Sequence, residues 1–254
     1  MTVPPAGPTD PDQHPVGSIC WVDLGVPDVD AATAFYSAVL GWQVDPSDPA
    51  GYRLAYLPGR RLVAALGPAE DPGAPYWTVY ARVLDVAATA RAAIAAGGLL
   101  VTPAAAAGDA GVAGVAAAVR DPASAPLSLW QPDAHPGTWA SGEPGSVADV
   151  QLRTDRPQDH EPFLHATLGW ELQGQRFVVD GLTSATLAPP VTGLPRQPPS
   201  PWLVRFHVDD VEAASRRAVT LGAHPLPTEP GTLLDPAGAL LGLAPATTLR
   251  TLQA

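Results

Sequence analysis

The strongest constraint on the fold is that the second half of the chain repeats the first at a nearly fixed spacing. The segment VDAATAFYSAVLGW, residues 29–42, is echoed by HEPFLHATLGW, residues 160–170. Phe35 and Trp42 match Phe163 and Trp170, which both lie 128 residues further along the chain. Self-similarity at a constant offset is the sequence signature of a duplicated unit. We therefore expect two related domains, of which the second is a diverged copy of the first.

A second passage repeats in the same order. PYWTVYARVLDVAATARAAIAAGG, residues 75–98, matches SPWLVRFHVDDVEAASRRAVTLGA, residues 200–223, at an offset of 125. Each copy then ends on an Asp-Pro element, and these elements begin at Asp121 and Asp235, which are only 114 residues apart. The second copy has therefore lost about eleven residues between its second helix and its last strand.

Composition and periodicity divide the chain into four parts. Residues 1–16 are rich in Pro and Asp and are predicted to form a disordered tail. Residues 17–131 form the first domain, residues 132–146 a Pro-, Gly- and Ser-rich linker, and residues 147–248 the second domain. In each domain, a strand-like segment followed by apolar residues at helical spacing occurs twice. This pattern predicts two units per domain, each consisting of a strand, a helix and further strands.

The composition also excludes some classes of partner. Hydrophobic residues make up 46% of the chain, enough for a packed core, and 25 acidic residues face 14 arginines with no lysine, a net charge of −11. This charge opposes binding to nucleic acid or to an anionic membrane. No apolar run reaches the roughly 20 residues of a membrane span, so a cytoplasmic location is expected. The lone Cys20 excludes an intrachain disulfide and a thiolate cluster, and is expected to be buried.

Several motifs together resemble one known family. A strand ending in Pro-Asp, a helix carrying AxxFYxxxLGW, a second strand and helix ending in Gly-Gly and a closing Asp-Pro strand resemble the vicinal oxygen chelate (VOC) superfamily over residues 18–245. Its members include glyoxalases, extradiol dioxygenases and bleomycin-resistance-type binding proteins, and the chain looks most like the tandem glyoxalase-like proteins of actinomycetes. The resemblance implies an α+β fold of four βαβββ modules, paired into two open mixed-sheet barrels whose concave faces line the site.

Alternation along the strands assigns side chains to the two faces of each sheet. Apolar rows such as Val204, Phe206 and Val208 are expected to face the helices, and Cys20 is placed in the corresponding row of the first strand. The opposite rows are expected to form the ligand-binding faces, with Trp21, Asp23, Thr78, Tyr80, Arg82, Ser128 and Trp130 in domain 1 and Gln151, Arg205 and His207 in domain 2.

The resemblance also raises the question of a metal site. Family members that hold a metal place His, Gln or Glu on the first strand of each half-unit and Glu on the closing strand. The matching positions here are Trp21, Thr78 and Ser128 in domain 1, and one near Asp149, Leu203 and Gly242 in domain 2. Indole and aliphatic side chains cannot ligate a hard cation, so no metal and no cofactor is expected. His14 and His135 fall in the tail and the linker, and we interpret them as solvated or structural.

Two classes of function remain open. The tryptophans and Tyr80 could provide stacking faces for a flat ligand, with Asp23 and Arg82 fixing its orientation, which favours a metal-free protein that sequesters a small aromatic or polycyclic metabolite. The alternative is a metal-independent isomerase, cyclase or lyase of secondary metabolism, with Asp23 or His207 as proton carrier. A metal-dependent glyoxalase or dioxygenase is disfavoured. The opposite interpretation is a filled barrel in which Asp23 and Arg82 pair with each other.

Differences between the two copies favour domain 1 as the working site. Leu164 stands where the first copy has Tyr36, and the second copy is shortened. A single site predicts that Trp21→Ala or Arg82→Ala abolishes ligand binding, whereas Arg205→Ala does not. The expected partner is a small molecule, and the chain is expected to be a monomer or a homodimer.

Overall fold

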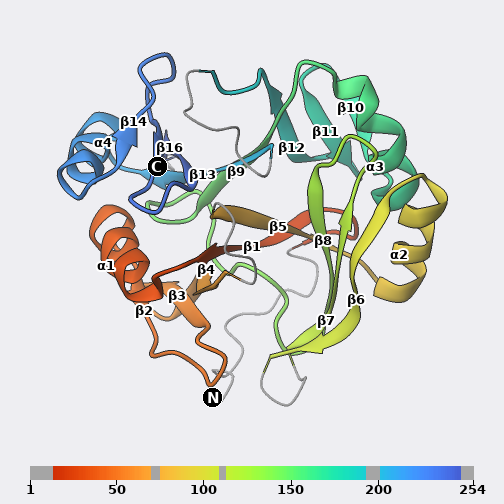
Figure 1. Ribbon diagram of the computed structural model, residues 1–254, viewed down its shortest axis with the longest axis horizontal. Coiled ribbons are helices and arrows are strands. Elements are labelled where there is room, and N and C mark those ends of the chain that lie inside the picture. The colour runs from red at the N-terminus through yellow and green to blue at the C-terminus, as the bar shows by residue number, and fades with distance from the viewer. Residues whose placement is uncertain (1–13, 70–74, 109–112, 193–200, 247–254) are drawn as a thin grey trace, which may run out of the picture.

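The computed structural model describes residues 14–69, 75–108, 113–192 and 201–246. Within these residues the two halves of the chain each form one eight-stranded mixed sheet with two α-helices (Figure 1). None of the described helices is long and apolar enough to cross a lipid bilayer. Most of the predicted tail, residues 1–13, lies outside the described residues.

Domain 1 contains the first sheet and its two helices. Its elements are β1 (Ile19–Val26), α1 (Val29–Leu40), β2 (Gln43–Val44), β3 (Arg53–Leu57), β4 (Arg61–Pro68), β5 (Tyr76–Arg82), α2 (Val86–Ala95), β6 (Leu99–Ala107), β7 (Gly114–Arg120) and β8 (Pro126–Pro132). The strand order is β2-β3-β4-β1-β5-β8-β7-β6. The two half-units meet where β1 pairs antiparallel with β5, and each of these strands pairs in parallel with the last strand of its own half-unit.

Domain 2 repeats this arrangement. Its elements are β9 (Val147–Arg153), the 3-10 helix η2 (Pro157–Asp159), α3 (Glu161–Leu168), β10 (Glu171–Gln173), β11 (Arg176–Val179), β12 (Leu182–Ala188), β13 (Trp202–Val208), α4 (Val211–Thr220), β14 (His224–Pro225), β15 (Thr232–Leu234) and β16 (Leu240–Pro245). The strand order, β10-β11-β12-β9-β13-β16-β15-β14, is equivalent to that of domain 1. The lost residues shorten the β14–β15 hairpin relative to β6–β7. The predicted duplicated α+β fold is confirmed.

Local sequence explains where the helices begin and end. Three helices start at an aspartate whose side chain accepts a hydrogen bond of 2.8–2.9 Å from the backbone N–H three residues further on: Asp28, Asp85 and Asp210. An aspartate at this position satisfies one of the N–H groups that a helix start leaves unpaired. The helix α3 starts at His160 without such a side-chain bond, and both LGW motifs end their helix at a left-handed glycine, Gly41 or Gly169.

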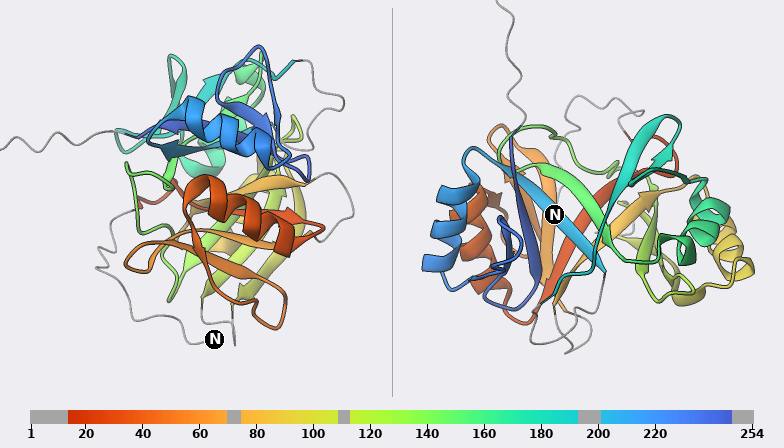
Figure 2. Two further views of the ribbon diagram at one scale, coloured as in Figure 1. Left: turned by 90° about the vertical axis from the view of Figure 1, so that its left-hand side faces the viewer. Right: turned by 90° about the horizontal axis from the view of Figure 1, so that it is seen from above.

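The helix-facing sides of the two sheets pack against each other in one continuous hydrophobic core. The ring centroids of Trp77 from β5 and Phe206 from β13 are 5.0 Å apart, and those of Trp42 and Phe206 are 5.3 Å apart. The helices pair across the domains, α1 with α4 and α2 with α3, as the right-hand view in Figure 2 shows. The concave face of each sheet, defined here as the face away from the helices, therefore points away from the other domain.

Tryptophan side chains also link the two halves of the chain. Each is buried, and its indole N–H donates to a backbone carbonyl of the other domain or of the linker: Trp42 to Gly145 at 2.8 Å, Trp170 to Gly17 at 2.6 Å and Trp202 to Pro126 at 2.6 Å. A buried indole needs such a partner, because an unpaired donor away from water is costly. In both copies, the Trp of the LGW motif therefore bonds to a segment outside its own half of the duplicated fold.

The predicted placement of one residue is wrong. Cys20 was placed in the helix-facing row of β1, but the pairing of β1 with β5 shifts between Ile19 and Trp21. This β-bulge puts Cys20 beside Trp21 in the cluster on the concave face, with its thiol 3.5 Å from the carbonyl oxygen of Tyr80. The residue is buried as expected, and burial raises the pKa of its thiol to about 12, so the thiol is not a reactive one.

Candidate functional site

The concave face of domain 1 is built on three neighbouring strands. β1, β5 and β8 set Asp23 opposite Thr78, Trp21 opposite Tyr80, Tyr80 beside Ser128 and Arg82 beside Trp130. The side chains that alternate with them, such as Trp77, Val79 and Ala81 on β5, are buried in the core between the sheets. The structure therefore brings the seven residues predicted for domain 1 onto one face.

Asp23 is the polar centre of this face. Its Oδ2 accepts two hydrogen bonds of 2.7 Å, one from the hydroxyl of Tyr52 and one from the hydroxyl of Tyr80. Burial, and next the Asp23 carboxylate, raise the pKa of Tyr52 well above its usual range, so this phenol is a neutral hydrogen-bond donor at neutral pH. A carboxylate held by two phenols is a fixed polar feature against which a ligand can be oriented.

Sequence reasoning missed Tyr52. It lies just before β3, outside any strand whose alternation could have placed it. Its ring packs over Gly67 of β4, where an added Cβ would come within 2.6 Å of the ring carbon Cδ2. A glycine inside a strand often marks such a close approach, so Gly67 was the available signal. Only the sheet order, however, shows that β4 pairs with β1 on the edge away from β5, so that Tyr52 can reach Asp23 from that side.

Aromatic side chains fill much of the face. One cluster contains Trp21, Tyr52, Tyr56, Tyr80, Trp130 and Trp139. His135 packs edge-on against Trp21, with 4.4 Å between ring centroids, and its carbonyl accepts a 2.8 Å hydrogen bond from the indole of Trp130. Both ring nitrogens of His135 are buried without a hydrogen-bond partner among the described residues. Burial lowers the pKa of His135 to about 4, so the imidazole is neutral at neutral pH.

The predicted linker, residues 132–146, folds onto this face. The backbone N–H of Thr138 donates to the carbonyl of Cys20 at 2.9 Å, and that of Trp139 donates to the carbonyl of Leu62 at 2.7 Å. Trp139 packs against the aromatic cluster. The linker is therefore a structural layer of domain 1. Of the two interpretations of His135, the structural one is confirmed and the solvated one is wrong.

Arg82 is held by the chain just before β1. Its Nη1 donates a hydrogen bond to the carbonyl oxygen of His14, whose Nε2 lies 3.0 Å from the carbonyl oxygen of Thr138. The ion pair between Asp23 and Arg82 that the sequence left open is not among the ion pairs formed between described residues. Asp23 and its neighbours Thr78 and Tyr80 are partly exposed, as is Arg82 further along β5.

The three site residues predicted in domain 2 lie on a separate face. Gln151 on β9 is opposite Leu203 of β13, and Arg205 follows Leu203 on the same face. The imidazole Nδ1 of His207 is 2.9 Å from the carbonyl oxygen of Pro245, so Nδ1 carries the proton and donates it. The structure does not bring these residues to Asp23, because the two concave faces lie on opposite sides of the molecule.

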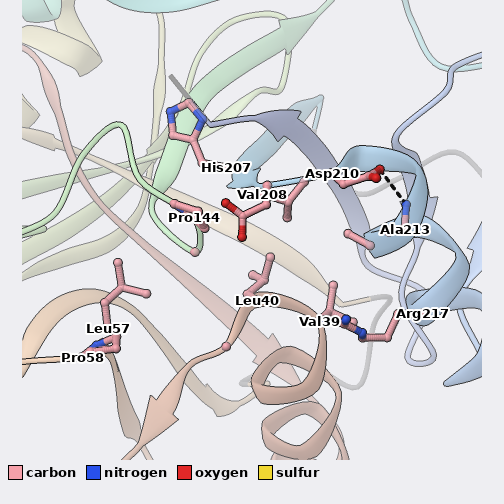
Figure 3. Close-up of a pocket in the computed structure, with 14 residues that line it drawn as sticks. Val39, Leu40, Leu57, Pro58, Pro144, His207, Val208, Asp210, Ala213 and Arg217 are labelled. Carbon is pink, nitrogen blue, oxygen red and sulfur yellow. Dashed lines mark hydrogen bonds between the residues drawn. The ribbon is translucent and has the colours of Figure 1, made fainter. Parts of the chain in front are cut away.

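A cavity of about 360 Å³ opens at the junction of the domains (Figure 3). Its apolar wall comes from the end of α1 and the end of β3, including Val39, Leu40 and Leu57. Asp210 and Arg217 of the α4 region also line it. The Oδ1 of Asp210 caps its helix at 2.9 Å from the N–H of Ala213, and Arg217 reaches the carbonyl oxygen of Ala38 on α1 at 3.4 Å. This cavity contains no residue of the Asp23 cluster, but His207, one of the three residues predicted for domain 2, lines it.

Comparison with known proteins places this architecture in a family. A sequence model of the glyoxalase-like domain matches residues 20–130. The protein named "Putative glyoxylase CFP32" of Mycobacterium tuberculosis is 32% identical over 255 residues, which cover 89% of this chain and 94% of CFP32. The chain belongs to the tandem glyoxalase-like proteins of the VOC superfamily. "Anthracycline biosynthesis protein DauV" of Streptomyces sp. strain C5 is 35% identical over 88% of this VOC protein and 91% of its own length.

Solved structures share the fold of this VOC protein at low sequence identity. A Mn(II)-bound glyoxalase from Novosphingobium aromaticivorans matches with a TM-score of 0.60 at 19% identity, covering 91% of this chain and 83% of that chain. The 2,3-dioxygenase LapB from Pseudomonas sp. KL28 matches with a TM-score of 0.60 at 14% identity, covering 91% and 93%. At such identities the likeness shows the shared architecture alone.

The residues of this VOC protein do not fit the divalent metal that the family name implies. The positions that the resemblance assigns to metal ligands are Trp21, Thr78 and Ser128 in domain 1, and one near Asp149, Leu203 and Gly242 in domain 2. Apart from Asp149, none of these residues has the carboxylate, imidazole or thiolate side chain that usually ligates a divalent ion in proteins. Among the described residues no three His, Cys, Asp or Glu side chains lie close enough to hold an ion.

Proposed function

We propose that this VOC protein binds a small aromatic or polycyclic metabolite on the concave face of domain 1 without using a metal. The observation that carries the proposal is the aromatic cluster gathered around a carboxylate that two phenols hold in place. Aromatic walls with a few fixed polar groups are typical of small-molecule sites. The Streptomyces relatives named for anthracycline biosynthesis support a polycyclic ligand class.

A metal-independent isomerase, cyclase or lyase would use the same face. Asp23 is the group available as proton carrier in that case, but its Oδ2 already accepts two hydrogen bonds from Tyr52 and Tyr80. The raised pKa of Tyr52 makes this phenol a poor proton donor at neutral pH. His207, the other candidate proton carrier, lies on the concave face of domain 2. Binding is therefore favoured over catalysis.

Calorimetric titration of the full chain with alizarin, a flat hydroxylated anthraquinone, tests the site directly. We expect Tyr80→Phe and Asp23→Asn each to weaken binding about tenfold, because each removes a hydrogen bond that orients the ligand and the carboxylate. The matched control is Asp180→Asn, an exposed aspartate in the turn before β12. Unchanged affinity in both site variants would show that alizarin does not bind around Asp23.

Two further measurements separate the alternatives. Stoichiometric Fe, Mn, Ni or Zn in the purified protein would overturn the metal-independent part of the proposal. To distinguish binding from metal-independent catalysis, a ligand that co-purifies is identified by mass spectrometry, incubated with the protein and analysed again. A ligand recovered unchanged supports binding, whereas its conversion establishes an enzyme.

A further inference from the structure

The concave face of domain 2 carries a connected set of charged and polar side chains. Arg205 on β13 lies opposite Asp149 on β9, and its Nη1 donates to Oδ2 of Asp149 at 3.2 Å. Two residues along β9, the Oε1 of Gln151 accepts a 3.0 Å hydrogen bond from Arg153, which also pairs with Glu229. Among the described residues of domain 1, Asp23 and its tyrosines occupy the corresponding face instead.

Three buried polar atoms on this face lack a hydrogen-bond partner among the described residues. They are Oδ1 of Asp149, Nε of Arg153 and Oγ1 of Thr186. Thr186 lies on β12 directly beside Gln151, so the three atoms belong to adjacent strands of one sheet. Leaving a buried donor or acceptor unpaired costs on the order of 1–3 kcal/mol, more when the group is charged. Such atoms gathered on one face indicate a site whose hydrogen bonds a ligand completes.

The charges define the polar end of such a ligand. A guanidinium has five N–H donors, and among the described residues that of Arg205 makes one hydrogen bond, to Asp149. The side chains of Arg205 and Asp149 are both 29% exposed, so a small molecule can reach them. Burial raises the pKa of Asp149, against the opposing effect of the nearby Arg205 guanidinium. The N–H groups of Arg205 that make no hydrogen bond among the described residues are suited to bind a carboxylate of the ligand. The unpaired Oδ1 of Asp149 is suited to accept a hydrogen bond from a hydroxyl or ammonium group of the ligand.

Apolar side chains lie next to this polar set. Leu203 comes two residues before Arg205 on the same face of β13, and it packs with Val191, Leu226 and Leu240 in a small cluster separate from the main core. In the closing strand, Gly242 lies opposite Arg205, where an added Cβ would come within 2.4 Å of Cγ of the arginine. The absence of a side chain at Gly242 thus leaves room for the Arg205 side chain, which lies between the Leu203 cluster and the charged residues of this face.

We propose that the concave face of domain 2 is a second binding site, for a small carboxylate that has a hydroxyl or amino group next to the carboxylate and an apolar body. Arg205 binds the carboxylate, Oδ1 of Asp149 accepts from the adjacent donor, and the hydrocarbon part lies over the face that covers the buried cluster of Leu203 and Leu240. This site is independent of the aromatic site in domain 1, from which it differs in both charge and lining.

The proposal is tested by calorimetric titration of the full chain with three compounds that share one body. They are 4-methylpentanoate, 2-hydroxy-4-methylpentanoate and leucine. If Asp149 accepts from the neighbouring donor, the hydroxy acid or leucine binds at least tenfold more tightly than 4-methylpentanoate. The more tightly bound of the two identifies the donor. Failure of all three to bind overturns the proposal, and equal binding of all three overturns the role of Asp149.

Variants locate the binding. Arg205→Gln is expected to abolish it, and Asp149→Asn to remove the preference for a compound with a donor. Arg216→Gln is the matched control, since Arg216 is an exposed residue on α4 that pairs with Glu212. If Arg205→Gln fails to fold, as judged by circular dichroism, Arg205→Lys replaces it and is expected to weaken binding tenfold or more, because a lysine cannot grip a carboxylate with two parallel bonds. Affinity equal to that of Arg216→Gln in the Arg205 variant would overturn the assignment.

Discussion

The aspartates of the two Asp-Pro elements show how single residues join the copies. Oδ2 of Asp121, in domain 1, lies 2.5 Å from Nδ1 of His160 at the start of α3. Oδ2 of Asp235, in domain 2, accepts a 2.9 Å hydrogen bond from the buried hydroxyl of Tyr36 on α1. Each aspartate is buried; its Oδ1 accepts from backbone N–H groups of its own turn, and its Oδ2 is bound by the other domain. The sequence shows the Asp-Pro motif at the end of each repeat. It does not show that the aspartates bind His160 and Tyr36, which are more than 35 residues away along the chain.

His135 gives a prediction about pH. Its folded pKa of about 4 lies below the 6.5 of an exposed histidine, so the unfolded chain binds more protons between these values and stability falls as the pH is lowered through this window. The full loss is on the order of 3 kcal/mol, from the size of the shift. His135→Phe keeps an aromatic ring beside Trp21 and removes the titrating group, so we expect a shallower loss of unfolding free energy between pH 7 and pH 4.

Urea unfolding at a series of pH values measures this difference. Burial also lowers the pKa of His14, so this histidine contributes to the pH dependence of both proteins. Parallel pH dependences for the wild type and His135→Phe would mean that the imidazole is not buried against Trp21 in solution.

At the scale of elements, the two copies differ in how their helices meet. Gly98, which follows α2, lies against α3, where an added Cβ would be 2.4 Å from Cε2 of Phe163 and 2.8 Å from the carbonyl oxygen of Arg120. The equivalent residue after α4 is Ala223, so the other helix pair tolerates the methyl group. The two copies therefore share the same strand order, but they differ in individual residues where their helices pack.

Gly98→Ala is accordingly expected to destabilise the protein by about 1–3 kcal/mol, as inserting a methyl group into a packed interface does. Chemical denaturation measures the loss. Combining it with Phe163→Leu should restore part of the stability lost to the alanine, because the smaller side chain relieves the contact with the ring. An unfolding free energy within 0.5 kcal/mol of wild type in the single variant would argue against close α2–α3 contact.

The bulge in β1 is the element-scale feature that the strand pattern concealed. Alternation predicts one phase for a whole strand, whereas the extra residue at Cys20 changes the phase between Ile19 and Trp21. The side chains from Trp21 onward kept their predicted faces because they follow the bulge.

At the scale of the whole molecule, the shared core makes the two domains one folding unit. Trp42 and Trp77 contact Phe206 across the junction, and the indoles of Trp170 and Trp202 donate hydrogen bonds to the other half of the chain. Separating the halves would expose these surfaces to water.

We therefore expect a single cooperative unfolding transition for the full chain, with coincident far-UV circular dichroism and tryptophan fluorescence. A fragment of residues 14–132 should lack a cooperative transition of its own, since its half of the core has nothing to pack against. Two resolved transitions in the full chain, or a stably folded fragment, would contradict this view.

Much of the fold can be read from patterns along the chain, although the bulge at Cys20 escaped them. Fixed offsets revealed the duplication, aspartates and glycines marked helix ends, and two-residue alternation placed Trp21, Asp23, Thr78 and Tyr80 on one face. Which distant segments meet depends on how the elements pack. Tyr52 reaches Asp23 because β3 and β4 pack beside β1, and the linker closes over the aromatic cluster because its backbone bonds to Cys20 and Leu62. Periodicity fixes the direction of a side chain along its own element, whereas its partner depends on how the elements assemble.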